Sequence, residues 1–366
     1  MTITSSPYRP PFWLRSPHLQ SLLGTSPLRR ARGAWLLRGV GATTTPHLID
    51  GGDGVRLHGM HSHIPGRTAR GLALLLHGWE GSVESSYMRL TAARLLAKGF
   101  DVFRLNFRDH GDTHHLNQAL FHSNRIDEVV HAAGDIARRF SPTQAEPGAT
   151  SPGGMVVAGY SLGGNFALRV GLRAPAAGLP LERVVAVCPV LDPAVTMAEM
   201  ERTLPVYLRH FEQSWRASLR RKRTAFPELY DFDDSVLKLR MRDLTRWMVE
   251  RHTDFDTLDD YFDGYSIAGE RLAALAMPAD ILTSEDDPVI PVREFRALRL
   301  NPECRVEIAR WGGHCAFLDG ATLEGYAERW VAERLTLAAD RRTAPRDASP
   351  AGRRNPPDQP VAPGTA

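Results

Sequence analysis

The chain has 366 residues, of which 43% are hydrophobic and 24% are charged, values typical of a globular protein with a sizeable core. Its 45 basic and 42 acidic residues nearly balance to a formal charge of +3, which gives no general reason to expect nucleic acid as a partner. The three cysteines are scattered along the chain, and we expect neither a disulfide framework nor a zinc site from Cys188, Cys304 and Cys315.

The N-terminal sequence has no pattern of a targeting or membrane segment. Prolines and arginines interrupt residues 1–24, where a signal peptide needs an unbroken apolar stretch. No run approaches the roughly 20 apolar residues that span a bilayer, so we expect no stable membrane insertion. Together with the low cysteine count, this predicts a soluble cytoplasmic protein.

Residues 1–30 are expected to form an N-terminal arm, followed by an α/β core over 31–190 and 277–338. Within that core, residues 33–40 and 54–60 have the composition of leading strands, which we expect to form an antiparallel hairpin.

Short apolar segments then alternate with helical patterns. The predicted strands are 72–78, 101–107, 155–160, 183–190, 279–285 and 305–311. The predicted helices are 87–98, 125–140, one that begins at 162, and a closing helix over 322–335. Strands that alternate with helices predict an α/β fold with a mostly parallel sheet covered by helices on both faces.

This alternation stops between residues 191 and 276, which are expected to form a helical cap insertion. Two apolar stripes at helical spacing occur there, one in each of two predicted helices: Leu208, Phe211, Trp215 and Leu219, and Leu237, Met241, Leu244 and Met248. We expect the stripes to pack on the core and also to line a substrate pocket. The basic run Arg220–Arg223 is interpreted as a solvated helix face. Residues 340–366, rich in Pro, Ala and Arg without aromatic residues, predict a disordered tail.

The sequence GYSLGGN, residues 159–165, places Ser161 where a buried strand ends and a helix begins. A serine at this point of a Gly-x-Ser-x-Gly turn is lifted out of the sheet, and only small neighbours fit around it. Such a serine needs a base to remove its proton and an acid to orient that base. Ser161 is therefore the candidate nucleophile.

The acid and the base are expected after later strands, in the order serine, acid, histidine. Asp286 and Asp287 follow the strand at 279–285, and His314 follows the strand at 305–311. We favour Asp287 as the residue that orients His314, with Asp286 as the alternative.

Two backbone N–H groups are needed to stabilise the oxyanion that forms on the substrate. We assign them to Leu162, at the start of a helix, and to Trp79, in the loop after the strand LALLL. His77 precedes Trp79 and is interpreted as a hydrogen-bonding residue that shapes this loop.

The segment RDHGDTHHLN, residues 108–117, concentrates histidines and aspartates and raises the alternative of a metal site. It lacks the ligand spacing of a binuclear hydrolase and the helical His-Glu-x-x-His pattern. We therefore expect a loop over the active site, with Arg108 and Asp109 in structural hydrogen bonds.

With LLLHGWEGS, GYSLGGN, SEDDPVIP and GGHCAF in this order, the chain resembles the α/β-hydrolases. More narrowly it resembles the AB hydrolase 4 family, which includes the YheT-like and embryogenesis-associated proteins, through PFWLRSPHLQSLL, HGWEGSVESSY, LNFRDHGD and Asn165. The resemblance covers most of residues 10–335. It implies an eight-stranded, mostly parallel sheet, a Ser161–Asp287–His314 triad, and activity on short-chain carboxylic esters or acylglycerols. Asp109 stands where many relatives carry glycine, which affects the expected shape of that loop.

The sequence thus predicts a serine hydrolase that acts on a small-molecule ester or acylglycerol and needs no metal or organic cofactor. The same apparatus also serves thioesterases, acyltransferases and amide hydrolases, which remain alternatives. A binding protein that has kept the hydrolase fold without turnover is a further alternative.

Overall fold

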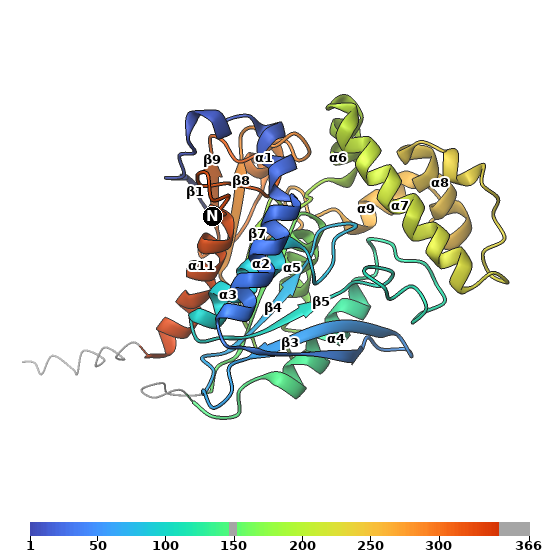
Figure 1. Ribbon diagram of the computed structural model, residues 1–366. Coiled ribbons are helices and arrows are strands. Elements are labelled where there is room, and N and C mark those ends of the chain that lie inside the picture. The colour runs from blue at the N-terminus through green and yellow to red at the C-terminus, as the bar shows by residue number, and fades with distance from the viewer. Residues whose placement is uncertain (146–151, 344–366) are drawn as a thin grey trace, which may run out of the picture.

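A nine-stranded sheet forms the centre of the protein (Figure 1), whose computed structural model describes residues 1–145 and 152–343. The strands are β1 (Thr2–Ser5), β2 (Thr43–Asp50), β3 (Arg56–His63), β4 (Leu72–Leu76), β5 (Asp101–Leu105), β6 (Met155–Tyr160), β7 (Leu181–Val187), β8 (Ala279–Ser284) and β9 (Arg305–Ala309). Their order is β1-β9-β8-β7-β6-β4-β5-β3-β2. Neighbours are parallel except β5–β3 and β3–β2, so the predicted mostly parallel sheet is confirmed.

Helices cover both faces of the sheet (Figure 1). The α-helices are α1 (Pro17–Gly24), α2 (Pro27–Gly39), α3 (Ser86–Ala97), α4 (Ile126–Phe140), α5 (Leu162–Arg173), α6 (Pro193–Arg202), α7 (Pro205–Ala225), α8 (Met241–His252), α9 (Leu258–Tyr265), α10 (Val292–Ala297) and α11 (Tyr326–Thr343). Two short 3-10 helices, η1 (Phe12–Leu14) and η2 (Val236–Lys238), complete the set in the described residues. Helices α2, α3 and α11 pack together on one face, and α4 and α5 pack together on the other.

Strand β4 shows why the two central strands β4 and β6 carry no charged side chains. Leu74 and Leu76 belong to the core cluster under α4 and α5, whereas Ala73 and Leu75 belong to the cluster under α3 and α11. Successive side chains of a strand point to opposite faces, so a strand covered on both sides alternates between two cores and shows no polar positions.

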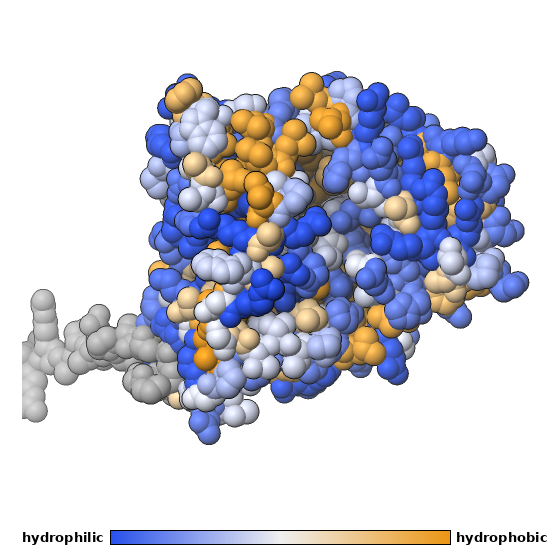
Figure 2. All heavy atoms as spheres, in the orientation of Figure 1, coloured by the Kyte–Doolittle hydropathy of each residue, from blue (hydrophilic) through white to orange (hydrophobic). Residues whose placement is uncertain are grey.

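The sheet has one strand more than the eight that the resemblance implies, because residues 2–5 pair in parallel with β9. All four side chains of β1 are exposed, so its sequence shows no apolar pattern. The remainder of the predicted arm contains α1 and the start of α2. Figure 2 shows apolar side chains gathered over this region, where Phe12, Leu19, Leu22 and Leu28 are exposed.

The prediction of a strand at residues 33–40 is wrong, because this segment is the second half of α2. Ser26 caps the helix by accepting the N–H of Arg29 at 3.4 Å, and Pro27 occupies the first turn. Both residues favour a helix start, since they satisfy or remove backbone donors that have no partner within the helix.

An antiparallel hairpin is present as predicted, but its first strand is β2. This strand contains Pro46 and is mostly polar, so its sequence lacks the apolar run that indicates a buried strand. An edge strand tolerates proline because one of its sides lacks a ladder partner.

The segment between β7 and β8 contains α6, α7, η2, α8 and α9, which lie to one side of the sheet in Figure 1. Leu208, Trp215 and Leu219 are buried on one face of α7, with Phe211 half-buried beside them, as predicted. The second predicted stripe is buried too, but Leu237 lies in η2 and not in α8.

The interpretation of residues 220–223 as a solvated face is wrong for Lys222, which is buried and joins α7 to the segment that follows β5. Its Nζ donates to Asp109 Oδ1 at 2.7 Å, to the carbonyl of Asn117 at 2.6 Å and to the carbonyl of Ala119 at 3.1 Å. The side chains of Lys222 and Asp109 are 1% and 4% exposed. Such a buried ion pair leaves a costly uncompensated charge when one partner is removed.

We expect Lys222→Met to lower the free energy of unfolding by about 3–5 kcal/mol, because Asp109 loses its buried cation. Urea denaturation of the purified variant measures this loss. Arg223→Met is the matched control, since the adjacent Arg223 pairs with Asp234 at an exposed position. That pair contributes at most about 1 kcal/mol. Equal losses in both variants would contradict the role given to Lys222.

The predicted closing helix exists as α11 and extends to Thr343. The first four residues of the predicted tail, 340–343, therefore belong to a helix. The rest of that tail, 344–366, lies outside the described residues.

Candidate active site

Ser161 occupies a sharp turn between β6 and α5. Its backbone has φ 53° and ψ −120°, a left-handed conformation that non-glycine residues rarely adopt. The Ser161 N–H donates to the carbonyl of Val187 at 2.9 Å. A Cβ added at Gly159 would lie 2.0 Å from the Gly163 carbonyl oxygen, and one at Gly163 would lie 2.4 Å from the carbonyl oxygen of His77. The two glycines are therefore required by close backbone contacts.

The structure brings the predicted acid, base and nucleophile into one chain of hydrogen bonds. His314 Nε2 is 2.9 Å from Ser161 Oγ, and His314 Nδ1 is 2.9 Å from Asp287 Oδ2. The other carboxylate oxygen of Asp287 accepts the N–H groups of Val289 and Ile290 at 2.8 and 3.0 Å. These two bonds hold the carboxylate on the Nδ1 side of the imidazole.

Asp286, the alternative acid, has a different partner. Its Oδ1 accepts the N–H of Gly313 at 3.0 Å, so this carboxylate supports the loop that carries His314. Of the two aspartates, only Asp287 forms a hydrogen bond with the His314 ring in the described structure.

The contact between Asp287 and His314 makes the imidazole of His314 more basic. Burial alone would lower the pKa of His314, but the adjacent Asp287 carboxylate and the Cys315 sulfur together outweigh burial and raise the pKa well above its usual value. The charged imidazolium is therefore stabilised, which is the form that arises when His314 accepts a proton.

The backbone after β4 passes directly beside the serine. A Cβ added at Gly78 would lie 3.3 Å from the Cβ of Ser161, and Trp79 and Leu162 both line the cavity that contains Ser161. Fully buried His77 shapes this loop, as predicted: its Nδ1 bonds to the Gly78 carbonyl at 2.8 Å, and its Nε2 accepts the Phe107 N–H at 3.2 Å.

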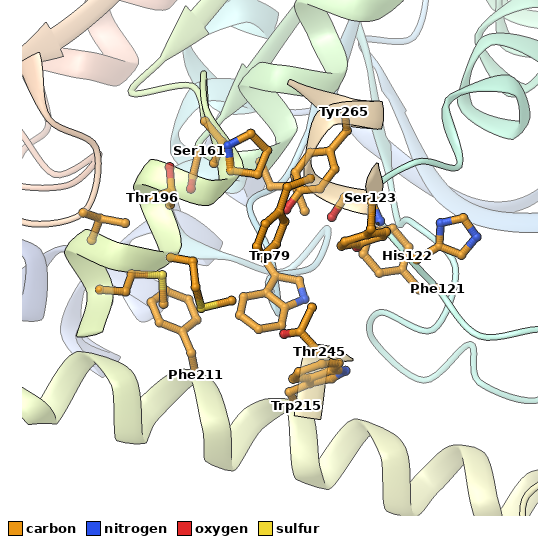
Figure 3. Close-up of a pocket in the computed structure, with 18 of the residues that line it drawn as sticks. Trp79, Phe121, His122, Ser123, Ser161, Thr196, Phe211, Trp215, Thr245 and Tyr265 are labelled. Atoms are coloured by element: carbon orange, nitrogen blue, oxygen red, sulfur yellow. Dashed lines mark hydrogen bonds between the residues drawn. The ribbon is translucent and has the colours of Figure 1, made fainter. Parts of the chain in front are cut away.

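A cavity that is open to solvent extends from Ser161 toward α7 and α8. In Figure 3, Ser161 lies at one end of the cavity, Trp215 and Thr245 lie at the other, and Trp79 lies between them. The ring of Trp79 stacks on Phe211 with centroids 5.5 Å apart, which joins the loop after β4 to α7. The lining is mainly apolar: Trp79, Phe121, Leu162, Val190, Pro193, Met197, Met200, Phe211, Trp215, Met248, Phe262 and Val289.

The histidine-rich loop at residues 108–117 is held by structural contacts. Arg108 pairs with Glu128 at 2.6 Å, and Asp109 accepts from Lys222, as predicted for this arginine and aspartate. His110 bonds to the Arg108 carbonyl at 2.7 Å, and His114 bonds to Ser218 of α7 at 2.8 Å. Burial lowers the pKa of His110 to about 4 and that of His114 to about 3, so both rings are neutral at pH 7.

Sequence reasoning missed the contribution of the N-terminal arm. Ser21 of α1 accepts the backbone N–H of His314 at 2.9 Å and donates to the Pro17 carbonyl at 2.8 Å. Gln20 accepts the N–H of Leu318 in the same loop at 2.8 Å. The arm therefore holds the loop that presents the histidine, and nothing in its local sequence indicates this distant partner.

Two of the three cysteines, although far apart in the sequence, meet beside the histidine. Cys188 directly follows β7, and Cys315 directly follows His314. One ligand atom from each of these three residues lies within 4.8 Å of the others. Their positions could have suggested this, because the carboxyl ends of the parallel strands of one sheet lie at the same edge.

The sequence profile of the Alpha/beta hydrolase family matches residues 73–350, and the chain belongs to this family. Among solved structures, an esterase from Pyrococcus furiosus is similar with a TM-score of 0.53 and 16% identity, over 84% of this chain and 94% of that one. An esterase from Pyrobaculum calidifontis is similar with a TM-score of 0.52 and 16% identity, over 90% and 99% of the two chains. The 2,6-dihydroxy-pseudo-oxynicotine hydrolase has a TM-score of 0.53 and 15% identity, over 88% and 76%. At these identities the similarity establishes a common fold.

Within the described residues, no helix has both the length and the apolar character needed to cross a bilayer.

Proposed function

We propose that this protein is a serine hydrolase that cleaves carboxylic esters with a short to medium acyl chain, including monoacylglycerols. The observation that carries the proposal is the hydrogen-bonded chain Ser161–His314–Asp287 at one end of an apolar cavity. We further propose that the chain is a cytoplasmic member of the AB hydrolase 4 group. Its free cysteines are compatible with a reducing compartment.

In the proposed reaction, His314 Nε2 takes the proton of Ser161 as Oγ attacks the ester carbonyl carbon. Asp287 orients the ring through Nδ1 and stabilises the imidazolium that forms. When the C–O bond to the alcohol breaks, His314 gives its proton to the departing oxygen, and the acyl group remains on Ser161. A water molecule then attacks the acyl carbon by the same route, releasing the carboxylic acid and restoring the serine.

The tetrahedral intermediates place a negative charge on the former carbonyl oxygen. We assign its stabilisation to the backbone N–H groups of Leu162 and Trp79. Leu162 begins α5, where the helix dipole favours a negative charge. The close approach of Gly78 to Ser161 supports the assignment of Trp79, the next residue in that loop.

We also propose that residues 191–276 act as a cap whose inner surface holds the acyl chain. Helices α6, α7, α8 and α9 all contribute lining residues to the cavity that contains Ser161. The apolar side chains that these helices contribute to the cavity favour binding of a hydrocarbon chain of the substrate.

We expect Thr245→Phe to shorten the cavity and shift the preference toward short acyl chains, because Thr245 lies at the end opposite Ser161 (Figure 3). The ratio of kcat/KM for p-nitrophenyl octanoate to that for the acetate ester should fall by roughly 10- to 200-fold. Thr224→Phe is the control, since the exposed Thr224 of α7 makes the same bond to the carbonyl four residues earlier. An equal loss for both esters would show that the acyl chain lies elsewhere.

A fluorophosphonate probe tests the proposed function directly, because it reacts covalently with an activated serine. The wild-type protein should be labelled at Ser161, and Ser161→Ala should lose the label. Labelling should also decline when p-nitrophenyl butyrate is present as a competing substrate. A folded wild-type protein that is not labelled would point to a hydrolase-fold binding protein instead. A matched panel of esters, thioesters and anilides then separates esterase activity from the alternative acyl chemistries.

A further inference from the structure

Two cysteines that have no role in the proposed reaction, Cys188 and Cys315, lie beside its proposed base, His314. Cys315 Sγ is 3.9 Å from His314 Nε2, the nitrogen that faces Ser161. Cys188 completes the group, and one ligand atom from each residue lies within 4.8 Å of the others. Both cysteines have positive φ angles, 43° for Cys188 and 61° for Cys315, a region that residues with a side chain rarely adopt. The fold thus keeps two thiols beside one imidazole through unusual backbone conformations.

Two thiolates and an imidazole are a ligand set that Zn²⁺ prefers, with Zn–S bonds of about 2.3 Å and Zn–N bonds of about 2.0–2.1 Å. Tetrahedral geometry with these bond lengths separates the ligand atoms by about 3.6–3.8 Å. The 3.9 Å between Cys315 Sγ and His314 Nε2 already approaches this separation. Since the whole group lies within 4.8 Å, a shift of about 1 Å brings the remaining ligand into range.

The second nitrogen of His314 provides an independent argument. A histidine that binds a metal through one nitrogen usually donates the other N–H to a carboxylate, which fixes the tautomer and the ring orientation. Asp287 Oδ2 lies 2.9 Å from Nδ1, so the ring is oriented with Nε2 available to a metal ion. Asp287 itself is fixed by two backbone N–H groups.

We propose that Cys188, Cys315 and His314 Nε2 form a Zn²⁺ site whose occupation reversibly inhibits the enzyme. Each cysteine thiol releases its proton to solvent as its Zn–S bond forms, and a water molecule takes the fourth position. No oxidation or reduction is involved. The metal uses the Nε2 lone pair that otherwise accepts the proton of Ser161, so the occupied site has no general base. Inhibition rests on the proposed function, whereas metal binding does not.

Cys304 offers a matched control within the same chain. It precedes β9 at the amino end of the strand, whereas Cys315 follows the carboxyl end, and its Sγ contacts the Met277 carbonyl at 3.7 Å. Cys304 is fully buried and is a free thiol, like Cys188. A Cys304→Ser variant therefore tests whether any buried thiol explains the effect.

The binding experiment uses the full-length, chelator-treated protein. Calorimetric titration with Zn²⁺ should show one tight site per chain, and Co²⁺ should produce a thiolate charge-transfer absorption band. Cys315→Ser and Cys188→Ser should each weaken Zn²⁺ binding by about 10- to 100-fold and diminish the cobalt band, whereas Cys304→Ser should change neither. Because Cys188 is fully buried, Cys315→Ser decides the outcome if the Cys188 variant does not fold.

The inhibition experiment measures p-nitrophenyl butyrate hydrolysis with and without Zn²⁺, and again after EDTA is added. Zn²⁺ should inhibit the wild type and Cys304→Ser, and EDTA should restore their activity. The half-inhibitory concentration should rise at least 10-fold in Cys315→Ser. Unchanged Zn²⁺ binding in Cys315→Ser would place the metal elsewhere among the 14 histidines and overturn the proposal. If the protein shows the cobalt band but has no esterase activity, the metal site is supported. Only the proposed function is then contradicted.

Discussion

Ser161→Ala is expected to lower kcat for p-nitrophenyl butyrate hydrolysis by on the order of 10⁶-fold. The variant lacks the only atom that we assign to the attack on the ester, although His314 and Asp287 keep their own hydrogen bond. KM should change little, because the apolar lining of the cavity is intact. Steady-state kinetics with highly purified protein measures both constants.

Ser235→Ala is the control for this substitution. Ser235 is exposed and bonds to the neighbouring Asp233, outside the residues that line the cavity. The kcat of the Ser235→Ala variant should equal that of the wild type. A Ser161→Ala protein that keeps wild-type activity would exclude the proposed nucleophile, whatever the other variants do.

Asp287→Asn is expected to lower kcat by about 10⁴-fold, because asparagine favours the wrong tautomer of the imidazole and no longer stabilises its charge. Asp287 raises the pKa of His314, and the proposed base can accept a proton only when its imidazole is neutral. Wild-type activity should therefore appear as the pH rises through this elevated pKa and disappear as the pH falls below it. The midpoint should lie above 6.5, the usual pKa of histidine.

Asp287 is the strongest of the groups that raise the pKa of His314, so removing its carboxylate should move the midpoint to lower pH in the residual activity of Asp287→Asn. The measurement is kcat/KM for an ester as a function of pH. Asp286→Asn is the matched comparison, since Asp286 bonds to Gly313 and not to the ring. It should keep a midpoint close to that of the wild type. If Asp286→Asn shows the larger loss and the shifted midpoint, our choice between the two aspartates is wrong.

The central part of the fold was predictable from sequence because its signals are local. Strands β4 and β6 are continuous apolar runs that end at glycine-containing turns, and covering both faces of a sheet requires this composition. The proximity of Ser161, Asp287 and His314 followed from their positions after strands of one parallel sheet, since the carboxyl ends of these strands share an edge.

The N-terminal region was predicted less well because its structure depends on distant partners. Strand β1 has only exposed side chains, and its backbone pairs with a strand near the other end of the chain. In α2 the helix signals Ser26 and Pro27 were present, but the apolar run that follows them also fits a strand.

The contact between Ser21 and the backbone of His314 joins residues 293 positions apart. At translation rates of about 5–20 residues per second, Ser21 is synthesised roughly 15–60 seconds before its partner. The histidine loop can be clamped only after β9 and the following turn have left the ribosome. A nascent chain that ends before residue 314 therefore carries the proposed nucleophile without the proposed base, and we expect it to have no hydrolytic activity.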